Sequence, residues 1–136
     1  MLAKIDEVLA LEKMLESEVQ VELELKHTFS NGIYLREISV PKNSLIVGKR
    51  HREDTINILI KGTMTIIDGD NRFTISAPYT FVANKYSKKA GYAHEDSVWV
   101  NVHKTNSEDL DEIEKQFIIS EEEYMQLKCK EKVCLG

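Results

Sequence analysis

The stretch Val47-Gly48-Lys49-Arg50-His51-Arg52-Glu53-Asp54-Thr55-Ile56-Asn57-Ile58-Leu59-Ile60-Lys61-Gly62 lies in the middle of the chain and decides the fold class. Its second half is rich in β-branched residues and ends at Lys61-Gly62, which is typical of a strand followed by a turn. Alternate side chains of a strand share a face. One face would therefore carry the polar side chains of His51, Glu53, Thr55 and Asn57, and the other the aliphatic side chains of Ile56, Ile58 and Ile60.

Short strands of the same kind are predicted on both sides of this stretch. They span residues 44–47, 63–67, 73–76, 79–83 and 97–102. The last of them repeats the two-faced pattern, with Ser97, Trp99, Asn101 and His103 on one face and valines on the other. About six to eight short strands separated by turns predict an all-β, double-sheet sandwich or barrel.

The N-terminal part of the sheet is read from alternation and from one turn signal. Val19, Val21, Leu23 and Leu25 alternate with polar residues, and Asn31-Gly32 follows as a hairpin turn. Beyond the turn, Ile33 and Leu35 are in one phase and Ile38 and Val40 in the other. This slip at Arg36-Glu37 predicts a β-bulge.

Helical periodicity flanks the strands. We expect an N-terminal helix within residues 1–18, a β-barrel over 19–104 and a helical extension over 105–136. Capping boxes are predicted at Thr105-Asn106-Ser107-Glu108 and at Ser120-Glu121-Glu122-Glu123. The two helical segments have apolar faces, formed by Leu2, Ile5 and Leu9 and by Leu110, Ile113 and Phe117. Exposed apolar faces of this kind predict a homodimer.

Composition narrows the functional class. The 136 residues suit one domain, and 23 acidic against 18 basic side chains give a net charge of -5, which disfavours general nucleic-acid binding. No apolar run reaches membrane-spanning length, and the N-terminus has no secretory pattern. Cys129 and Cys134 are too few for a disulfide framework, so we expect a reduced, cytoplasmic protein.

Residues 47–62 resemble the first motif of the cupin superfamily, whose members are double-stranded β-helix (jelly-roll) barrels. The second cupin motif is similar to residues 78–89, and the whole chain resembles small cupin-like proteins of tailed bacteriophages. The resemblance implies the jelly-roll fold and, for a phage protein, the host-cell cytoplasm. With Gly62 as anchor, His51 matches the second histidine of the first motif, Lys49 the first histidine and Thr55 the glutamate. Lys89 replaces the last metal-binding histidine.

These replacements argue against cupin metal chemistry, because a lysine ammonium has no lone pair and repels a cation. We therefore expect no metal and no cofactor. An alternative metal set is His51, Glu53 and His103, and a metal-free isomerase or epimerase could use His51 with Glu53 as an acid–base pair. A solvated outer face remains an alternative for the polar side chains.

Basic residues gather in two segments that the cupin register brings to one barrel mouth, namely Lys49, Arg50 and Arg52, and Lys85, Lys88 and Lys89. They predict a non-catalytic protein that binds an anionic small molecule, such as a nucleotide or a sugar phosphate, or a host protein. The expected ligand-binding residues are Arg50, His51, Asn57, Lys88, Lys89, Tyr92, Trp99, Asn101 and His103. The alternatives are a cupin enzyme, a dimeric interaction module without ligand, and loop lysines that are merely solvated.

Overall fold

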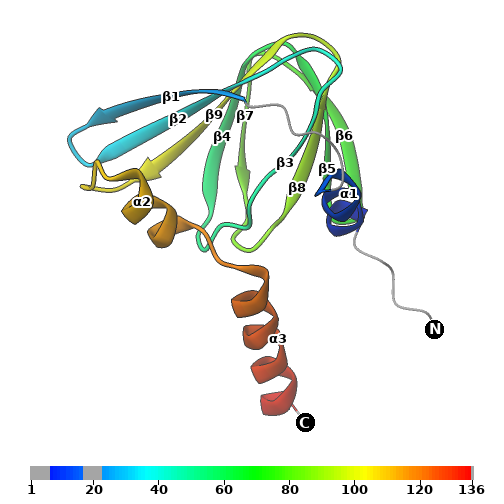
Figure 1. Cartoon of the computed structure of the whole chain (residues 1–136), viewed down its shortest axis with the longest axis vertical. Helices are drawn as coiled ribbons and strands as arrows, with labels where there is room; N and C mark the ends of the chain where they lie inside the picture. Colours follow the sequence, from blue (N-terminus) through cyan, green and yellow to red (C-terminus); the bar gives the residue numbers. More distant parts are fainter. Residues whose placement is uncertain (1–6, 17–22, 136) are drawn as a thin grey trace.

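The computed structural model describes residues 7–16 and 23–135. In these residues nine strands form two antiparallel sheets that face each other, with three helices outside them (Figure 1). The strands are β1 (Glu24–Ser30), β2 (Ile33–Val40), β3 (Leu45–Val47), β4 (Thr55–Lys61), β5 (Thr63–Asp68), β6 (Asn71–Ser76), β7 (Tyr79–Ala83), β8 (Lys89–Ala93) and β9 (Ser97–Lys104). The helices are α1 (Glu7–Glu16), α2 (Leu110–Phe117) and α3 (Glu121–Leu135).

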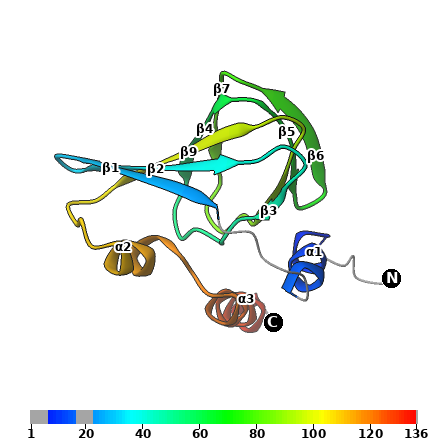
Figure 2. The same ribbon diagram turned by 45° about the horizontal axis from the view of Figure 1, so that its top comes forward.

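The strand order is that of a jelly roll. One sheet has the order β1-β2-β9-β4-β7 and the other β3-β8-β5-β6, so consecutive strands repeatedly cross from sheet to sheet. Figure 2 shows the two sheets curving around a common interior. The predicted all-β double-sheet barrel with helices at both ends is confirmed.

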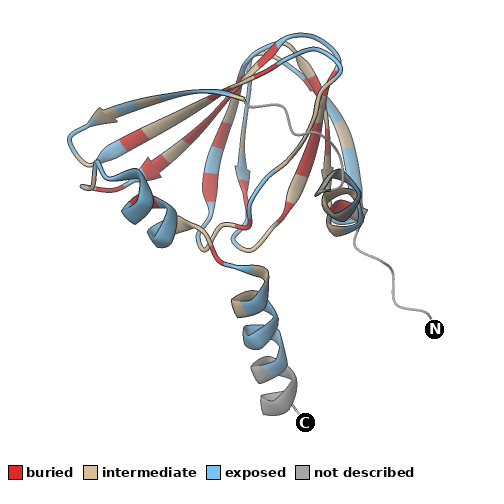
Figure 3. Ribbon diagram, in the orientation of Figure 1, coloured by how far each residue is buried: buried red, intermediate tan, exposed pale blue. Residues whose placement is uncertain are grey.

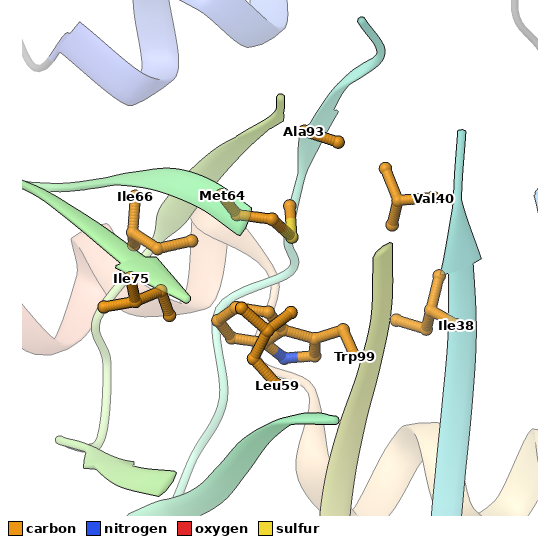
Figure 4. Packing of buried hydrophobic residues seen from close by; sticks show 8 residues of the cluster. All are labelled: Ile38, Val40, Leu59, Met64, Ile66, Ile75, Ala93 and Trp99. Carbon is orange, nitrogen blue, oxygen red and sulfur yellow. The ribbon is translucent and has the colours of Figure 1, made fainter. Parts of the chain in front are cut away.

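A hydrophobic core fills the space between the sheets at the end away from α2. It contains residues from both sheets, and Figure 4 shows their side chains converging: Ile38, Val40, Leu59, Met64, Ile66, Ile75, Ala93 and Trp99. Leu59 and Met64 are fully buried. Burial of a leucine or methionine side chain stabilises the fold by about 1.5–3 kcal/mol, so this core holds the two sheets together.

The turn between β4 and β5 requires glycine. Gly62 has φ +92°, and a Cβ at this position would lie 2.7 Å from the carbonyl oxygen of Asp96. Only glycine combines this backbone conformation with so close an approach. The residue that anchors the sequence motif is therefore also a fixed point of the fold.

Two predictions about the strands are wrong. β2 pairs with β1 and with β9 in unbroken register from Ile33 to Val40, so there is no bulge at Arg36-Glu37. Ile33 and Leu35 simply belong to the outer face of the strand, while Ile38 and Val40 belong to its inner face. β8 was expected to be loop because its sequence KAGYA has low β propensity. It is a strand because small residues fit there, and a Cβ on Gly91 would come within 2.9 Å of Met64 Cε.

The helices cover limited parts of the barrel. α1 packs against β3, β5 and β8 and buries Val8 completely. α2 is capped by Asp109 rather than by the predicted box at Thr105, whereas the Ser120 hydroxyl caps α3 as expected. α3 runs away from the barrel (Figure 1). None of the described helices has the length and apolar character needed to cross a membrane.

Candidate functional site

A cavity of about 320 Å³ lies between the inner faces of the two sheets and α2. Figure 1 places α2 beside the ends of β2 and β9, where it covers the wide end of the barrel. Apolar side chains such as Leu25, Ile46, Met64, Ile113 and Phe117 form much of the wall. The polar lining consists of His27, Tyr34, Arg36, Lys49, His51, Asn57, Lys89, Trp99, Asn101, His103 and Glu114.

The polar faces of β4 and β9 point into this cavity. Asn57, Asn101 and His103 are all buried, while Ile56 and Ile60 of β4 are 44% and 47% exposed. Figure 3 shows the resulting alternation of buried and exposed residues along these strands. The alternative of a solvated polar face is wrong for both strands.

A hydrogen-bonded amide pair forms the floor of the cavity. Asn57 Oδ1 accepts hydrogen bonds from Trp99 Nε1, at 3.0 Å, and from Asn101 Nδ2. Asn57 Nδ2 donates to the Thr55 carbonyl at 3.0 Å. These bonds leave Asn57 little capacity for a ligand, whereas no protein partner is found for Asn101 Oδ1 among the described residues. Asn57 thus fixes Trp99 and Asn101, and Asn101 faces the ligand space.

Two histidines from different strands meet beside this floor. The rings of His51 and His103 lie 5.4 Å apart in an edge-to-face arrangement, and His103 also stacks on Tyr34 and Phe117. His51 Nδ1 is 3.0 Å from Thr55 Oγ1, and that hydroxyl donates to the Glu53 carbonyl. Because the hydroxyl has only one proton, it must accept from His51 Nδ1–H. The Nε2 atom of His51 therefore keeps a lone pair that is available to a ligand.

Both imidazoles are neutral at pH 7. Burial, assisted by nearby His103, Lys89 and Arg36, lowers the pKa of His51 to about 4. Burial and the charge of Arg36 lower the pKa of His103 to about 4 as well. The charge of the cavity consequently comes from its arginine and lysines and not from its histidines.

Two cations line the cavity without an anionic partner. In the described part of the chain, neither Arg36 nor Lys89 makes a salt bridge, and the hydrogen bond found for Lys89 is a long one of 3.4 Å to Ser87 Oγ. Burial lowers the pKa of Lys89, although Asp68 opposes this effect. An unpaired cation in a partly buried site is costly unless an anion joins it. Sequence reasoning missed Arg36, whose place on the inner face was hidden by the supposed bulge.

The predicted basic mouth does form, since Tyr86 N donates to the His51 carbonyl and Gly48 N to the Lys89 carbonyl. Acidic residues of the helices neutralise most of it, however. Arg50 binds Glu121 through two hydrogen bonds of 3.0 and 3.1 Å and stacks on Tyr124.

The other mouth cations also have carboxylate partners. Lys88 lies 3.0 Å from Glu12 and 3.5 Å from Glu121, and Arg52 pairs with Glu123. Lys49 at the cavity rim pairs with Glu114. Arg50 and Lys88 thus fasten α1 and α3 to the barrel and do not line the cavity.

Other predicted site residues also lie elsewhere. Glu53 is exposed, so it forms no acid–base pair with His51 in the cavity. Tyr92 points to the outer face of its sheet, donates to Asn43 Oδ1 and contacts His94. Of the predicted ligand-binding residues, the structure brings together His51, Asn57, Lys89, Trp99, Asn101 and His103.

The cavity residues do not fit a cupin metal. No group of three histidine, cysteine or carboxylate side chains that could hold a metal ion is found in residues 7–16 and 23–135. His51 and His103 offer two nitrogen ligands, but Arg36 and Lys89 are close enough to His51 to affect its pKa and would repel a divalent cation. The predicted third ligand, Glu53, points to solvent.

Comparison with solved structures identifies the fold. KdgF from Halomonas sp. superposes with a TM-score of 0.56 at 15% identity, over 69% of this chain and 90% of that one. An RmlC-like cupin with a double-stranded β-helix fold from Methanocaldococcus jannaschii gives a TM-score of 0.50 at 12% identity, over 66% and 85%. The fold is that of the cupins.

A third cupin-fold structure adds to this agreement. It is a cupin superfamily protein from Desulfitobacterium hafniense, with a TM-score of 0.53 at 8% identity, over 76% of this chain and 92% of that one. Compared by sequence alone, the chain matches no protein-family model and no curated protein. At these identities the cupin likeness defines the architecture, and function has to be argued from the cavity itself.

Proposed function

We propose that this cupin-fold protein binds a small organic carboxylate in the cavity, without metal and without catalysis. The observation that carries the proposal is the pair Arg36 and Lys89, two cations that face the cavity and have no salt-bridge partner among the described residues. A carboxylate would supply the missing anion. A guanidinium binds carboxylates through two parallel hydrogen bonds, and the lysine adds a point charge.

The size of the cavity restricts the ligand. A volume of about 320 Å³ equals that of roughly ten water molecules and lies at the small end of ligand pockets. This favours a molecule smaller than a nucleotide. The volume thus narrows the broader expectation of a nucleotide or sugar phosphate.

The walls restrict the ligand further. Leu25, Ile46, Met64 and Phe117 face the cavity, and they would contact the body of the bound molecule. A sugar phosphate would place several hydroxyls against these side chains without hydrogen-bond partners, which is costly. A carboxylate with an apolar body satisfies both the cations and the walls. Asn101 and the Nε2 atom of His51 remain to bind one further polar group.

An enzymatic role has less support from the cavity. The acid–base pair of His51 and Glu53 is not assembled, because Glu53 is exposed. The tailed-phage origin, a host partner and the host-cell location stay predictions from sequence resemblance.

Binding can be tested with small probes and the single tryptophan. Benzoate, hexanoate, inorganic phosphate, glucose 6-phosphate and AMP would be titrated against full-length protein while Trp99 fluorescence and thermal shift are recorded. We expect at least one of the two carboxylates to bind and to bind more tightly than the three phosphates. Added salt should weaken binding, because partly exposed charges are screened over about 8 Å at physiological ionic strength.

Matched variants separate the cavity cations from the mouth cations. Arg36→Gln and Lys89→Gln should each weaken carboxylate binding about 10- to 100-fold, the scale of a lost charge-assisted hydrogen bond. Lys88→Gln removes the same charge one residue away and should leave binding unchanged, because Lys88 points to Glu12 and Glu121. Equal affinity of the Arg36→Gln variant, or no binding of either carboxylate at 10 mM, would contradict the proposal.

Metal analysis of untagged protein provides the remaining control. We expect no stoichiometric iron, zinc, manganese or nickel after treatment with a chelator. One retained equivalent would contradict metal-free binding and would direct attention to His51 and His103 as ligands.

A further inference from the structure

The outer face of the five-stranded sheet is aliphatic and exposed. Because side chains alternate, the residues of β4 and β9 that do not face the cavity form a second surface on the outside of the barrel. Its most exposed members are Ile33, at 46%, Ile56, at 44%, Ile60, at 47%, and Val82, at 58%. Val98, Val100 and Val102 of β9 lie beside them, paired in register with β2 and β4. We call these residues the outer sheet face.

The helices of this chain lie elsewhere. α1 contacts β3, β5 and β8 of the other sheet, and α2 lines the cavity on the inner side. Figure 2 shows both of them, together with α3, on the opposite side of the barrel from the outer sheet face. The apolar face of α2 that was expected to form a dimer is used within the chain, because Ile113 is 5% exposed and lines the cavity. Leu2 and Ile5 lie outside the described residues.

We infer that two copies of this chain associate through the outer sheet face. The sheet has five strands of five to eight residues. At about 4.8 Å between strands and about 3.4 Å per residue, it measures roughly 24 Å by 24 Å, which is on the order of 600 Å². A standard stable interface buries about 800 Å² per partner, so one such face with its rim is of the required size.

The pattern of side chains suits a second copy. The centre of the face, on β9 and β4, carries valines and isoleucines and no charged residue. Charges stand at its margins: Lys61 and Lys104 at strand ends, and Lys26 opposite Glu37 on the β1–β2 side. A twofold axis in the interface places the aliphatic centre against its own image and leaves both signs of charge at the wet rim. Two aligned sheets pack in this way at about −30° in β-sandwiches.

The oligomeric state of the full chain tests this inference. Light scattering and sedimentation velocity between 5 and 200 µM should give about 31 kDa, twice the 15.6 kDa of one chain. Raising NaCl from 0.15 to 1 M should not dissociate the dimer, because an apolar interface is not screened by salt. A dimer built on the ion pairs of α1 and α3 would weaken instead.

Paired variants locate the interface. Ile56→Glu with Val82→Glu should raise the dissociation constant at least 100-fold, and Thr80→Arg, an exposed position on β7, should also dissociate the dimer. Met125→Glu with Leu127→Glu adds the same charges to exposed apolar positions of α3 and should leave the dimer intact. Circular dichroism and Trp99 fluorescence verify folding, and Thr80→Arg alters no buried side chain if the double variant fails to fold.

Three results would overturn the inference. Wild-type protein could remain monomeric at 200 µM, in which case no second copy covers the face. The outer-face variants could stay dimeric, or the α3 control could become monomeric, and either result would place the interface elsewhere.

Discussion

Lowering the pH from 7 to 5 should destabilise the folded protein by about 3–4 kcal/mol, because two buried histidines must be protonated on unfolding. His51 and His103 have pKa values of about 4 in the fold against an ordinary value of 6.5, chiefly through burial. At pH 5 nearly all unfolded chains but only about one in ten folded ones carry each proton, and by linkage this costs about 2 kcal/mol per histidine. The two rings are neighbours, so their contributions are not fully additive.

The sign follows from the direction of the pKa change. A folded-state pKa below the unfolded value means that the stabilisation is complete above pH 6.5, declines between pH 6.5 and 4, and is fully lost below pH 4. Hydrogen bonds from Lys49 and Arg52 lower the pKa of Glu114 and of Glu123. The stabilisation from these carboxylates is lost mainly below their ordinary value of 4.5, so pH 5 isolates the histidines. A loss of 3–4 kcal/mol is large against a typical total of about 5–15 kcal/mol.

Urea unfolding followed by Trp99 fluorescence at pH 7 and pH 5 measures this difference. His103→Gln should remove about 2 kcal/mol of the pH dependence, whatever its effect on stability at pH 7. Asn101→Ala is the matched control, because it alters the same cavity without a titrating group and should keep the full pH dependence. Wild-type stability that is equal at the two pH values within 1 kcal/mol would refute the assignment of neutral, buried histidines, as would an unchanged pH dependence in His103→Gln.

Two further predictions concern fixed points of the fold. Arg50→Met should cost about 2–4 kcal/mol in urea unfolding and increase hydrogen exchange in the first turn of α3, because Arg50 is 5% exposed and its loss leaves Glu121 without its main partner. Unchanged exchange in α3 would contradict that role. Gly62→Ala should cost at least about 3 kcal/mol through left-handed backbone and collision with Asp96, whereas Gly69→Ala, at φ +60° with open space around it, should cost about 1 kcal/mol.

The fold was predictable because its signals are local. The strand that ends at Gly62 and the Asn31-Gly32 turn were both read from residues adjacent in sequence, and both are present in the structure. The cap at Ser120 is also a local signal, a hydroxyl three residues before the amide of Glu123. β8 escaped because its reason to be extended is not local. Its small residues fit only because Met64 of another strand occupies the space above Gly91.

The site was predictable only in part, because it depends on which face of each strand turns inward. For β9 both faces looked plausible from sequence, and the polar one proved to be internal. For β2 the aliphatic residues on both faces were mistaken for a slip in phase, and Arg36 was lost with it. One signal could have found it: Tyr34 and Arg36 share a phase that matches the aromatic and polar phase of Trp99, Asn101 and His103.

The mouth cations were misassigned for a different reason. Arg50 and Glu121 are 71 residues apart in the chain, and nothing in their local sequences indicates that they pair. The acidic run at the start of α3 was read as a helix cap alone. It also neutralises Arg50 and Arg52, so a count of basic residues overestimated the free positive charge.

The replacements that remove the cupin metal ligands also reverse the charge preference of the cavity. Lys89 stands where the last metal-binding histidine of the family would be, and Arg36 adds a second cation. With His51 and His103 neutral, these two side chains set a positive field that disfavours a metal ion and favours an anion. A bound carboxylate would in turn offset the charges that lower the pKa of His51, so binding and protonation become linked. Carboxylate affinity should therefore increase as the pH falls toward 5, until loss of folding stability overtakes it.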